Sequence, residues 1–335
     1  MISRFFKKKK PKIIFFGTPE FCLPTLQKCY ELFNVVGVVT QPDRPRGRGH
    51  KVSPCPVKSF ASEQSTPCFS PASLKKESPE LKEFQAFIMA NKVDLFVVLA
   101  YGNMLPDWAL QKPRLGALNL HASLLPKWRG AAPIQRAIEF GNNSTGVSLQ
   151  KMVKKMDAGD VLHEKKYLIG RLDNSESLSD SLSLLSAQTL EEYFKNKFKG
   201  ALAGVPQDET QVSFADKITK EEAQWSPEWT STQTHNKVRA FFLWPKVKVL
   251  VGADNKVITL LRTNLTPASA ELKLSPGQIL LKEGAVYLGT KSTQPTDPVL
   301  ELLSLQPPGK GPTSAWDFFQ NLQSAEAPLI VCTPS

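Results

Sequence analysis

The sequence predicts an α/β fold, in which a doubly wound, Rossmann-like parallel sheet is followed by a small C-terminal OB-like β-barrel. Strand and helix patterns alternate over residues 12–200, an order that favours a parallel sheet with right-handed crossovers. Short strands separated by turn residues then dominate residues 246–306, which is typical of a small barrel. The 335 residues are enough for two such domains.

The expected strands of the first domain are short apolar or β-branched runs, which suit buried positions in a sheet. They are residues 12–17, 35–41, 66–71, 94–100, 116–123, 144–153 and 159–169. Helices are expected between them, for example over residues 79–92, where Leu81, Phe84, Phe87 and Ile88 form an apolar stripe after Pro79. A long amphipathic helix over residues 177–200 closes the domain.

The chain is therefore expected to divide into four segments. These are a basic tail (residues 1–11), a catalytic domain (12–200), a polar linker (201–211) and a C-terminal domain (212–335). After a helix around residues 232–242, the C-terminal domain has strand patterns at 246–252, 256–263, 277–290 and 299–306, separated by turn residues.

The net charge of +11 is concentrated in two segments. Six basic and no acidic residues lie from Met1 to Lys12, and five basic residues accompany a single acidic one from Gln41 to Lys58. An excess of this kind points to a polyanionic partner. The composition, with 41% hydrophobic residues, excludes a disordered chain, and no apolar run approaches the ~18 residues that a membrane-spanning helix needs.

The five cysteines are odd in number and lack paired CxxC spacing, as expected of small buried side chains in a reducing compartment. The apolar run after the basic N-terminus, Ile13 to Phe16, is shorter than a signal-peptide core. We therefore expect a cytoplasmic protein.

Common nucleotide and hydrolase motifs are missing from the sequence. Gly17-Thr18-Pro19 follows the first strand in place of G-x-G-x-x-G, and no P-loop, H-E-x-x-H or G-x-S-x-G occurs. A polar cluster instead ends the strand over residues 116–121. Asn119 and His121 alternate with Leu120, so both point to one face, at the edge where open parallel sheets bind ligands. A structural histidine with a capping asparagine is the alternative interpretation.

Asp157 precedes a glycine-containing turn into the next strand and is the expected partner of this pair. A carboxylate beside His121 would orient the imidazole and favour its charged form, and an amide donor could hold a developing oxyanion. Together they fit acyl transfer to an amine without a covalent nucleophile. Asp157, Asp160 and His163 could also be taken for metal ligands, but the turn and strand around them would scatter them, so no metal is expected.

These residues lie in a block, NLHASLLPKWRGAAPIQ, that resembles the signature of folate-dependent formyltransferases. DAGD resembles their aspartate-containing loop. With GTPEF, TQPDRPRGRG, VLAYGNMLP and LLSLQPPGKGP, the similarity covers about residues 12–319. Within the family, the pattern is most similar to members that act on initiator methionyl-tRNA.

The resemblance implies roles for individual residues. Asn119 would bind the oxyanion, His121 would be the catalytic histidine and Asp157 its partner. The folate-binding segment would comprise Ser123, Leu124, Leu125 and Pro126, with VLAYGNML walling the pterin pocket. The donor would be 10-formyltetrahydrofolate, the acceptor the α-amino group of methionine on initiator methionyl-tRNA, and the enzyme a metal-free monomer.

The same resemblance implies a role for the segment TQPDRPRGRGHK, residues 40–51, which we call the arginine-rich loop. Arginines alternating with Pro and Gly cannot bury themselves but can reach phosphates, and we expect the loop to grip the acceptor stem of the tRNA. The candidates are Arg44, Arg46, Arg48 and Lys51, with Lys246, Lys248 and Arg262 of the C-terminal domain as a weaker second surface.

Two departures from the family pattern are present. Lys155-Met156 precede Asp157 where Gly-Leu is usual, and Phe242-Leu243 replace Asn-Pro at the entry to the C-terminal domain. Two other functions stay open: a formyltransferase acting on an amino sugar nucleotide or another small amine, and a non-catalytic RNA-binding protein with an OB-fold. The first gives no reason for the arginine-rich loop, and the second gives none for Asn119, His121 and Asp157 together.

Overall fold

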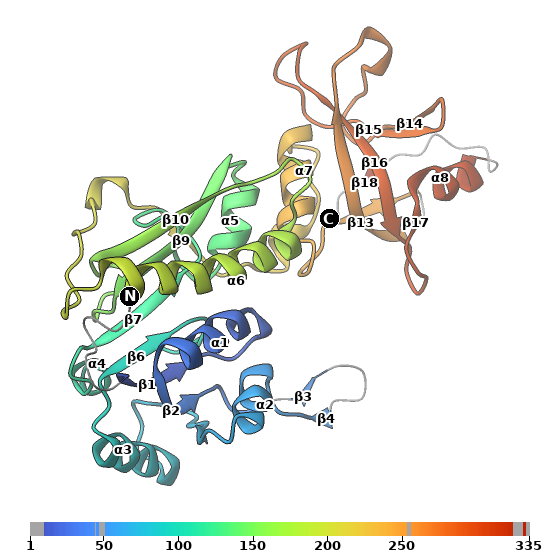
Figure 1. Cartoon of the computed structure of the whole chain (residues 1–335). Coiled ribbons are helices and arrows are strands. Elements are labelled where there is room, and N and C mark those ends of the chain that lie inside the picture. Colours follow the sequence, from blue (N-terminus) through green and yellow to red (C-terminus); the bar gives the residue numbers. More distant parts are fainter. Residues whose placement is uncertain (1–9, 44, 47–50, 253–255, 324–330, 333–335) are drawn as a thin grey trace. The chain divides into compact units, whose positions relative to one another are not determined.

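The computed structural model of the chain describes residues 10–43, 45–46, 51–252, 256–323 and 331–332. The chain divides into two compact units (Figure 1). Unit 1 comprises Met1–Pro133, Ser144–Leu168 and Ser179–Ala215, and unit 2 comprises Ile134–Asn143, Ile169–Leu178 and Asp216–Ser335. The boundaries expected from the sequence stay a prediction. In the described residues, no helix is both long and apolar enough to cross a membrane.

Unit 1 contains a seven-stranded sheet in the order β10-β9-β7-β6-β1-β2-β5. Its strands are β1 (Lys12–Phe16), β2 (Asn34–Val39), β5 (Cys68–Phe69), β6 (Leu95–Val98), β7 (Ala117–His121), β9 (Ser144–Lys151) and β10 (Val161–Leu168). From β5 to β7 all neighbours are parallel. The first strand of this group lies at its centre and the chain order reverses there, so the doubly wound prediction is confirmed.

The prediction of a wholly parallel sheet is wrong at one edge, because β9 runs antiparallel to both β7 and β10. Only residues 152–160 join β9 to β10, and none of them is helical. A parallel pair needs a crossover of about a dozen residues or more, so this short connection fits only antiparallel neighbours.

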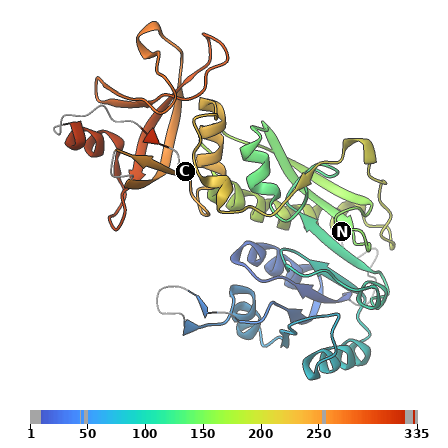
Figure 2. The ribbon, with the colours of Figure 1, turned by 180° about the vertical axis from the view of Figure 1, so that it is seen from behind.

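Helices cover both faces of this sheet (Figures 1 and 2). Those of unit 1 are α1 (Leu23–Leu32), α2 (Pro56–Glu63), α3 (Pro79–Asn91), α4 (Asp107–Gln111) and most of α6 (Ser175–Glu192). Ser78 caps α3 by accepting a hydrogen bond from the Leu81 N–H at 3.1 Å. The predicted stripe of α3 packs on the β1 residues Ile14 and Phe16.

The other face of the sheet carries α1 and α6. The Ser183 hydroxyl of α6 donates to the Phe21 carbonyl just before α1 at 2.7 Å, and Lys28 pairs with Glu191 at 3.3 Å. Because successive β1 side chains point to opposite faces, all of Ile13 to Phe16 are buried. The sheet therefore has an apolar core on both of its faces at β1.

Unit 2 contains an antiparallel sheet in the order β14-β15-β16-β13-β12-β18, with β17 pairing beside β16. The strands are β12 (Lys248–Val251), β13 (Lys256–Thr266), β14 (Ile279–Lys282), β15 (Ala285–Leu288), β16 (Val299–Gln306), β17 (Thr313–Ser314) and β18 (Val331–Cys332). The predicted β domain is confirmed as this sheet. No pairing joins β14 to β18 in the described part of the chain, so barrel closure is not seen.

The helices of unit 2 are the larger part of α5 (Pro133–Glu139), α7 (Ser231–Ala240) and α8 (Ala315–Gln323). α7 starts with a capping box in which the Thr230 and Gln233 side chains each bind the other's backbone. Its His235 is buried, and Nδ1 lies 2.9 Å from the Thr263 hydroxyl on β13. Burial, and next the nearby Arg239, lower the pKa of His235 to about 4.

Candidate active site

The polar cluster lies at the carboxyl end of β7, next to the centre of the sheet. Asn119 and His121 project from one face of this strand, as the alternation predicts. The register places Gln150 of β9 opposite Asn119, and Ser148 opposite His121. Cross-strand partners share a face, so four polar side chains from two strands meet here.

The connection between β9 and β10, residues 152–160, brings Asp157 to the cluster; we call it the Asp157 loop. Its base is closed by a hydrogen bond from the Lys151 N–H to the Asp160 carbonyl at 3.0 Å. Asp157 itself has a positive φ of 50°, which is uncommon for a residue with a side chain. A Cβ at Gly159 would lie 1.7 Å from the Lys151 carbonyl oxygen, so only glycine fits there.

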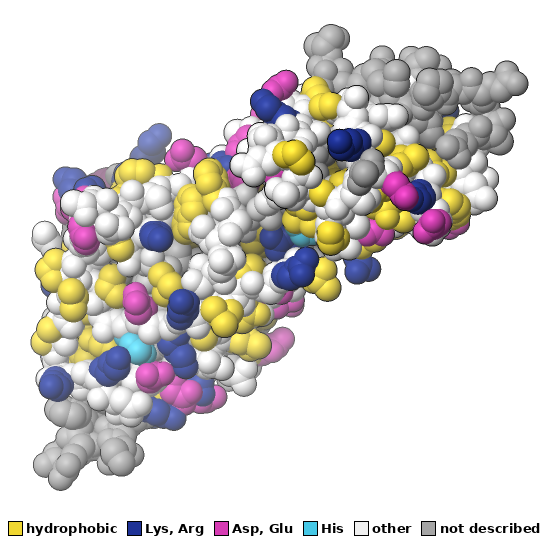
Figure 3. Space-filling view, turned by 90° about the horizontal axis from the view of Figure 1, so that it is seen from above, with side chains coloured by type: hydrophobic (Ala, Val, Ile, Leu, Met, Phe, Trp, Pro, Cys, Tyr) yellow, Lys and Arg dark blue, Asp and Glu magenta, His cyan; other side chains and the backbone are white. Residues whose placement is uncertain are grey.

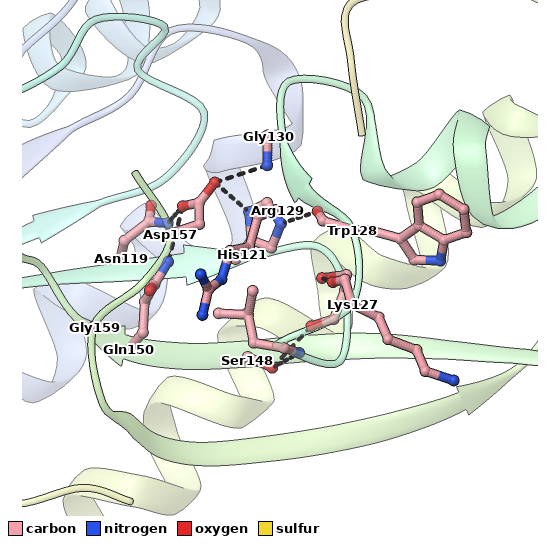
Figure 4. Close-up of polar contacts among 12 residues, drawn as sticks. Asn119, His121, Lys127, Trp128, Arg129, Gly130, Ser148, Gln150, Asp157 and Gly159 are labelled. Carbon is pink, nitrogen blue, oxygen red and sulfur yellow. Dashed lines mark hydrogen bonds and ion pairs between the residues drawn. The ribbon is translucent and has the colours of Figure 1, made fainter. Parts of the chain in front are cut away.

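The Asp157 carboxylate accepts hydrogen bonds from both sides (Figure 4). Oδ1 accepts from Gln150 Nε2 at 2.9 Å and from Asn119 Nδ2 at 3.4 Å. Oδ2 accepts from the Gly130 N–H at 3.0 Å and faces His121 Nδ1 at 3.7 Å. The structure thus brings Asn119, His121 and Asp157 together, although they span 38 residues of sequence.

The environment of His121 fixes which ring nitrogen can exchange a proton. Its Nε2 lies 2.7 Å from the Trp128 carbonyl oxygen. A carbonyl only accepts, so Nε2 carries a proton and Nδ1, opposite Asp157, is the nitrogen that can gain or lose one. The side chains of His121 and Asp157 are only 7% and 12% exposed. Charge that develops on the ring is therefore little screened by water.

Gly130 supplies its donor from strand β8 (Arg129–Gly130), which pairs with β11 (Phe214–Ala215). Its φ of 127° is accessible only to glycine. A Cβ there would also lie 2.7 Å from the Ala215 carbonyl oxygen. The backbone of β11 thus fits against Gly130 only because that residue has no side chain.

The predicted folate-binding segment, Ser123–Pro126, follows β7 directly. The Ser123 hydroxyl is buried and donates to the Lys127 carbonyl at 2.6 Å. Ser148 accepts from the Leu125 N–H at 3.0 Å and donates to the Ser123 carbonyl at 2.8 Å. These bonds fix the shape of the segment beside His121, whereas its role in folate binding stays a prediction.

The predicted wall of the pterin pocket, VLAYGNML, leaves the end of β6, the parallel neighbour of β7. Tyr101 is buried and its ring packs edge-on against Phe16, at 5.4 Å between ring centres. Burial raises the pKa of Tyr101 to about 12, so its hydroxyl stays neutral at physiological pH. This loop and the Ser123 segment leave neighbouring strands at the same edge of the sheet.

The arginine-rich loop is only partly described. Arg44 and Arg48 lie outside the described residues, whereas Arg46 of β3 (Pro45–Arg46) and Lys51 of β4 (Lys51–Val52) are paired in a two-stranded hairpin. Asp43 closes its base by accepting from the Cys55 N–H at 3.2 Å and from Lys58 at 2.6 Å. In Figure 1, this pair lies beyond α2, away from the sheet.

Charges elsewhere on the described surface are mixed. On the face in Figure 3, Lys and Arg side chains are interspersed with Asp and Glu. Lys246, Lys248 and Arg262, the weaker candidates, all lie in unit 2, and Lys248 and Arg262 are exposed on β12 and β13. Their role in RNA binding stays a prediction.

The residues considered as metal ligands do not form a cluster. His163 lies on β10, with Nδ1 3.0 Å from Lys197 Nζ and Nε2 3.3 Å from a Glu192 oxygen. Burial, and next the positive charge of Lys197, lower the pKa of His163. In the described part of the chain, no group of three or more His, Cys, Asp or Glu side chains could hold a metal ion.

Sequence reasoning missed several residues of the site. Gln150 and Gly130 contact Asp157 directly, and Arg129, Gln207 and Glu209 form a further network behind it. Gln150 could have been found by pairing the two neighbouring strands in register. No sequence motif around Gln207 and Glu209 indicates a role in the site, because both lie in the segment that the sequence predicts to be a linker.

Two family models match the chain. One described as "Formyl transferase" matches residues 11–193, and one described as "Formyl transferase, C-terminal domain" matches residues 217–323. The chain is also 42% identical over 310 residues to the methionyl-tRNA formyltransferase of Methylococcus capsulatus, an alignment that covers 92% of this chain and 96% of the relative.

Solved structures with a similar fold include an N-formyltransferase from Helicobacter canadensis in complex with folinic acid and dTDP-3-aminofucose. Its TM-score is 0.63 at 14% identity, over 89% of this chain and 99% of that one. HypX from Aquifex aeolicus, in complex with tetrahydrofolic acid, has a TM-score of 0.55 at 17% identity over 95% of this chain, which spans 48% of the length of HypX. Identities this low support the fold alone.

Proposed function

The chain belongs to the formyl transferase family, and from this premise we propose that it transfers the formyl group of 10-formyltetrahydrofolate to the α-amino group of methionine on initiator methionyl-tRNA. The product is N-formylmethionyl-tRNA for translation initiation, and we place the enzyme in the cytoplasm, as a monomer. The acceptor is inferred from the relative that shares 42% identity over nearly its whole length. The observation that carries the chemistry is the convergence of Asn119, His121 and Asp157 at the end of β7.

The reaction forms a carbon–nitrogen bond between the methionine amine and the formyl carbon and breaks the bond from that carbon to N10 of the folate. The amine loses a proton and N10 gains one. Asn119 Nδ2 and the protonated His121 ring stabilise the oxyanion of the tetrahedral intermediate. Nδ1 of His121 is the nitrogen that exchanges a proton, and Asp157 opposes the positive charge that the ring then carries.

The donor is proposed to bind between the two loops that leave β6 and β7. The half-buried side chain of Leu124 provides apolar surface of the kind that a flat heterocycle requires, whereas Tyr101 and Leu125 are buried within the two loops. Ser148 holds the backbone of the second loop and thereby keeps this surface in place. An apolar side chain next to the polar cluster supports a folate as the donor.

The tRNA is proposed to contact the loop that contains Arg44, Arg46, Arg48 and Lys51. The β3–β4 pair gives this loop a hairpin stem, and Asp43 fixes its base through Cys55 and Lys58. A fixed base lowers the conformational freedom that the loop loses when its side chains bind phosphates. We assign the four basic side chains to the acceptor stem.

Transfer of labelled formyl from 10-formyltetrahydrofolate tests the proposal. The wild-type chain is given methionyl initiator tRNA, methionyl elongator tRNA or an amino sugar nucleotide. We expect rapid transfer to the initiator tRNA and little to the other two. Preferred transfer to the amino sugar nucleotide would reject the proposed acceptor, and no transfer to any amine would reject the activity.

A further inference from the structure

The segment that follows α6, residues 205–215, lies beside the Asp157 loop and is tied down at both ends. At one end, Val205 and Val161 exchange backbone hydrogen bonds of 2.9 Å. At the other, the Arg129 N–H donates to the Ser213 carbonyl at 2.9 Å, and β11 pairs with β8. The side chains between these anchors are thereby held close to the Asp157 loop.

Gln207 lies between the two anchors and bonds to the Asp157 loop. Its Nε2 donates to the carbonyls of Asp157 at 2.8 Å and of Gly159 at 2.7 Å. An amide NH₂ has two protons, so both are used on the backbone that surrounds the candidate catalytic carboxylate. The amide oxygen of Gln207 in turn accepts from Arg129 Nε at 3.0 Å and Nη2 at 2.9 Å.

Arg129 extends this contact into a closed ring of interactions. Its guanidinium is 1% exposed and pairs with Glu209 at 2.8 Å, and Glu209 accepts from Lys155 of the Asp157 loop at 2.9 Å. The ring thus runs from the loop through Gln207, Arg129 and Glu209 back to the loop. Hydrogen bonds from Arg129, and next from Lys155, lower the pKa of Glu209 to about 2, so the carboxylate is ionised at neutral pH.

The ring supports both the Asp157 carboxylate and the Gly130 N–H that donates to it. Asp157 has a positive φ and needs outside support to keep that backbone conformation. Arg129 is also the chain neighbour of Gly130, whose N–H bonds to Asp157 Oδ2. The ring therefore positions both the carboxylate and one of its donors relative to His121.

We propose that Gln207 is a positioning residue for the formyl transfer, which holds the Asp157 loop against His121 through the ring that it forms with Arg129, Glu209 and Lys155. This inference rests on the proposed function. The hydrogen bonds of the Gln207 side chain go to the Asp157 loop and to Arg129, so it acts through the geometry of Asp157. Misplacement of a catalytic group by about 1 Å costs about 10²-fold in rate.

Two substitutions separate this role from simple packing. Gln207→Met keeps the length of the side chain but removes every hydrogen bond. Gln207→Glu keeps an acceptor for Arg129 but removes the donors to the loop carbonyls. Gln211→Met is the matched control, because Gln211 is exposed in the same segment and its side chain makes no hydrogen bond in the described structure.

Steady-state kinetics with methionyl initiator tRNA should show kcat lowered about 10- to 100-fold in both Gln207 variants, with KM for either substrate within about threefold of wild type. Limited trypsin digestion should cut both variants faster than wild type after Lys154 and Lys155. Gln211→Met should match wild type in both assays.

Each outcome decides a separate point. A Gln207→Glu variant with wild-type kcat would overturn the inference, since it would mean that contact with Arg129 alone suffices. Unchanged cleavage after Lys154 and Lys155 in both variants would overturn it as well. A wild-type protein that does not formylate the tRNA would reject the proposed function, and the trypsin assay would then still test whether Gln207 holds the loop.

Discussion

Replacement of Asp157 by Asn removes the negative charge opposite His121 with almost no change of shape. The new amide has one oxygen and one NH₂ group, whereas both carboxylate oxygens now accept hydrogen bonds. With the NH₂ on the Oδ1 side, it faces the donors of Gln150 and Asn119; on the Oδ2 side, it faces the Gly130 N–H and His121. Either orientation sets donor against donor, and such a lost bond to a charged group is worth about 1.5–3 kcal/mol.

The loss of charge acts on the transition state. At the 3.7 Å between His121 Nδ1 and Asp157 Oδ2, two unit charges attract by about 4 kcal/mol at an effective dielectric constant of about 20. Most of this attraction, about 3–4 kcal/mol, arises only as the ring takes up positive charge, so its loss corresponds to a fall in kcat of about 10²–10³-fold.

Formyl transfer to methionyl initiator tRNA at saturating substrate, measured from about pH 5 to about pH 9, is the assay. The Asp157→Asn variant should show the lower kcat, and its pH–rate profile should differ from that of wild type because the charged ring has lost its partner. Asp107→Asn is the control, since it breaks an exposed ion pair with Lys154 of the same loop. A kcat within about threefold of wild type and an unmoved profile would refute the coupling.

Three further changes should give distinct results. His121→Ala should lower kcat by about 10²–10⁴-fold while tRNA binding persists in a filter-binding assay, and wild-type turnover would remove His121 from the chemistry. Arg48→Ala should raise KM for tRNA several-fold and reduce the salt dependence of that KM, leaving folate binding intact; an unchanged KM would count against the loop. His235 is neutral in the folded chain and gains a proton on unfolding, so its contribution to stability is present above about pH 6.5 and is lost as the pH falls to about 4. Urea unfolding of His235→Gln should therefore depend less on pH over this window, by up to about 3 kcal/mol in the free energy of unfolding, and an equal dependence would reject this assignment.

The inner strands of unit 1 could be predicted because they are buried on both faces. Continuous apolar runs such as Ile13 to Phe16 then mark them plainly. The helix α3 was predicted from the helical spacing of its apolar residues, of which Leu81, Phe84 and Ile88 are buried. The antiparallel direction of β9 was not predictable from its composition, because direction follows from the length of the connection and from the neighbouring strand. The short hairpin of β3 and β4 was missed because its loop has no apolar pattern.

Only some residues of the candidate site could likewise be predicted from the sequence. Asn119 and His121 are two residues apart on one strand, so their shared face follows from the strand period alone. The proximity of Asp157 required the register of β7, β9 and the loop between β9 and β10. Arg129 and Gln207 are 78 residues apart and meet only in the folded chain, so the polar segment around Gln207 resembles an ordinary linker in sequence.

Gly130 contributes to the site through its backbone, but its position leaves no room for a side chain. Its N–H bonds to Asp157, and a backbone donor survives every substitution except proline. The same residue has a φ of 127°, and a Cβ there would lie only 2.7 Å from the Ala215 carbonyl oxygen, so any side chain would push β8 from β11. Random mutagenesis of residues 117–135 should therefore recover active variants with changes at exposed Lys127 but none at Gly130. Exposed side chains of this segment, such as Lys127, can therefore change, whereas Gly130 has no permitted replacement.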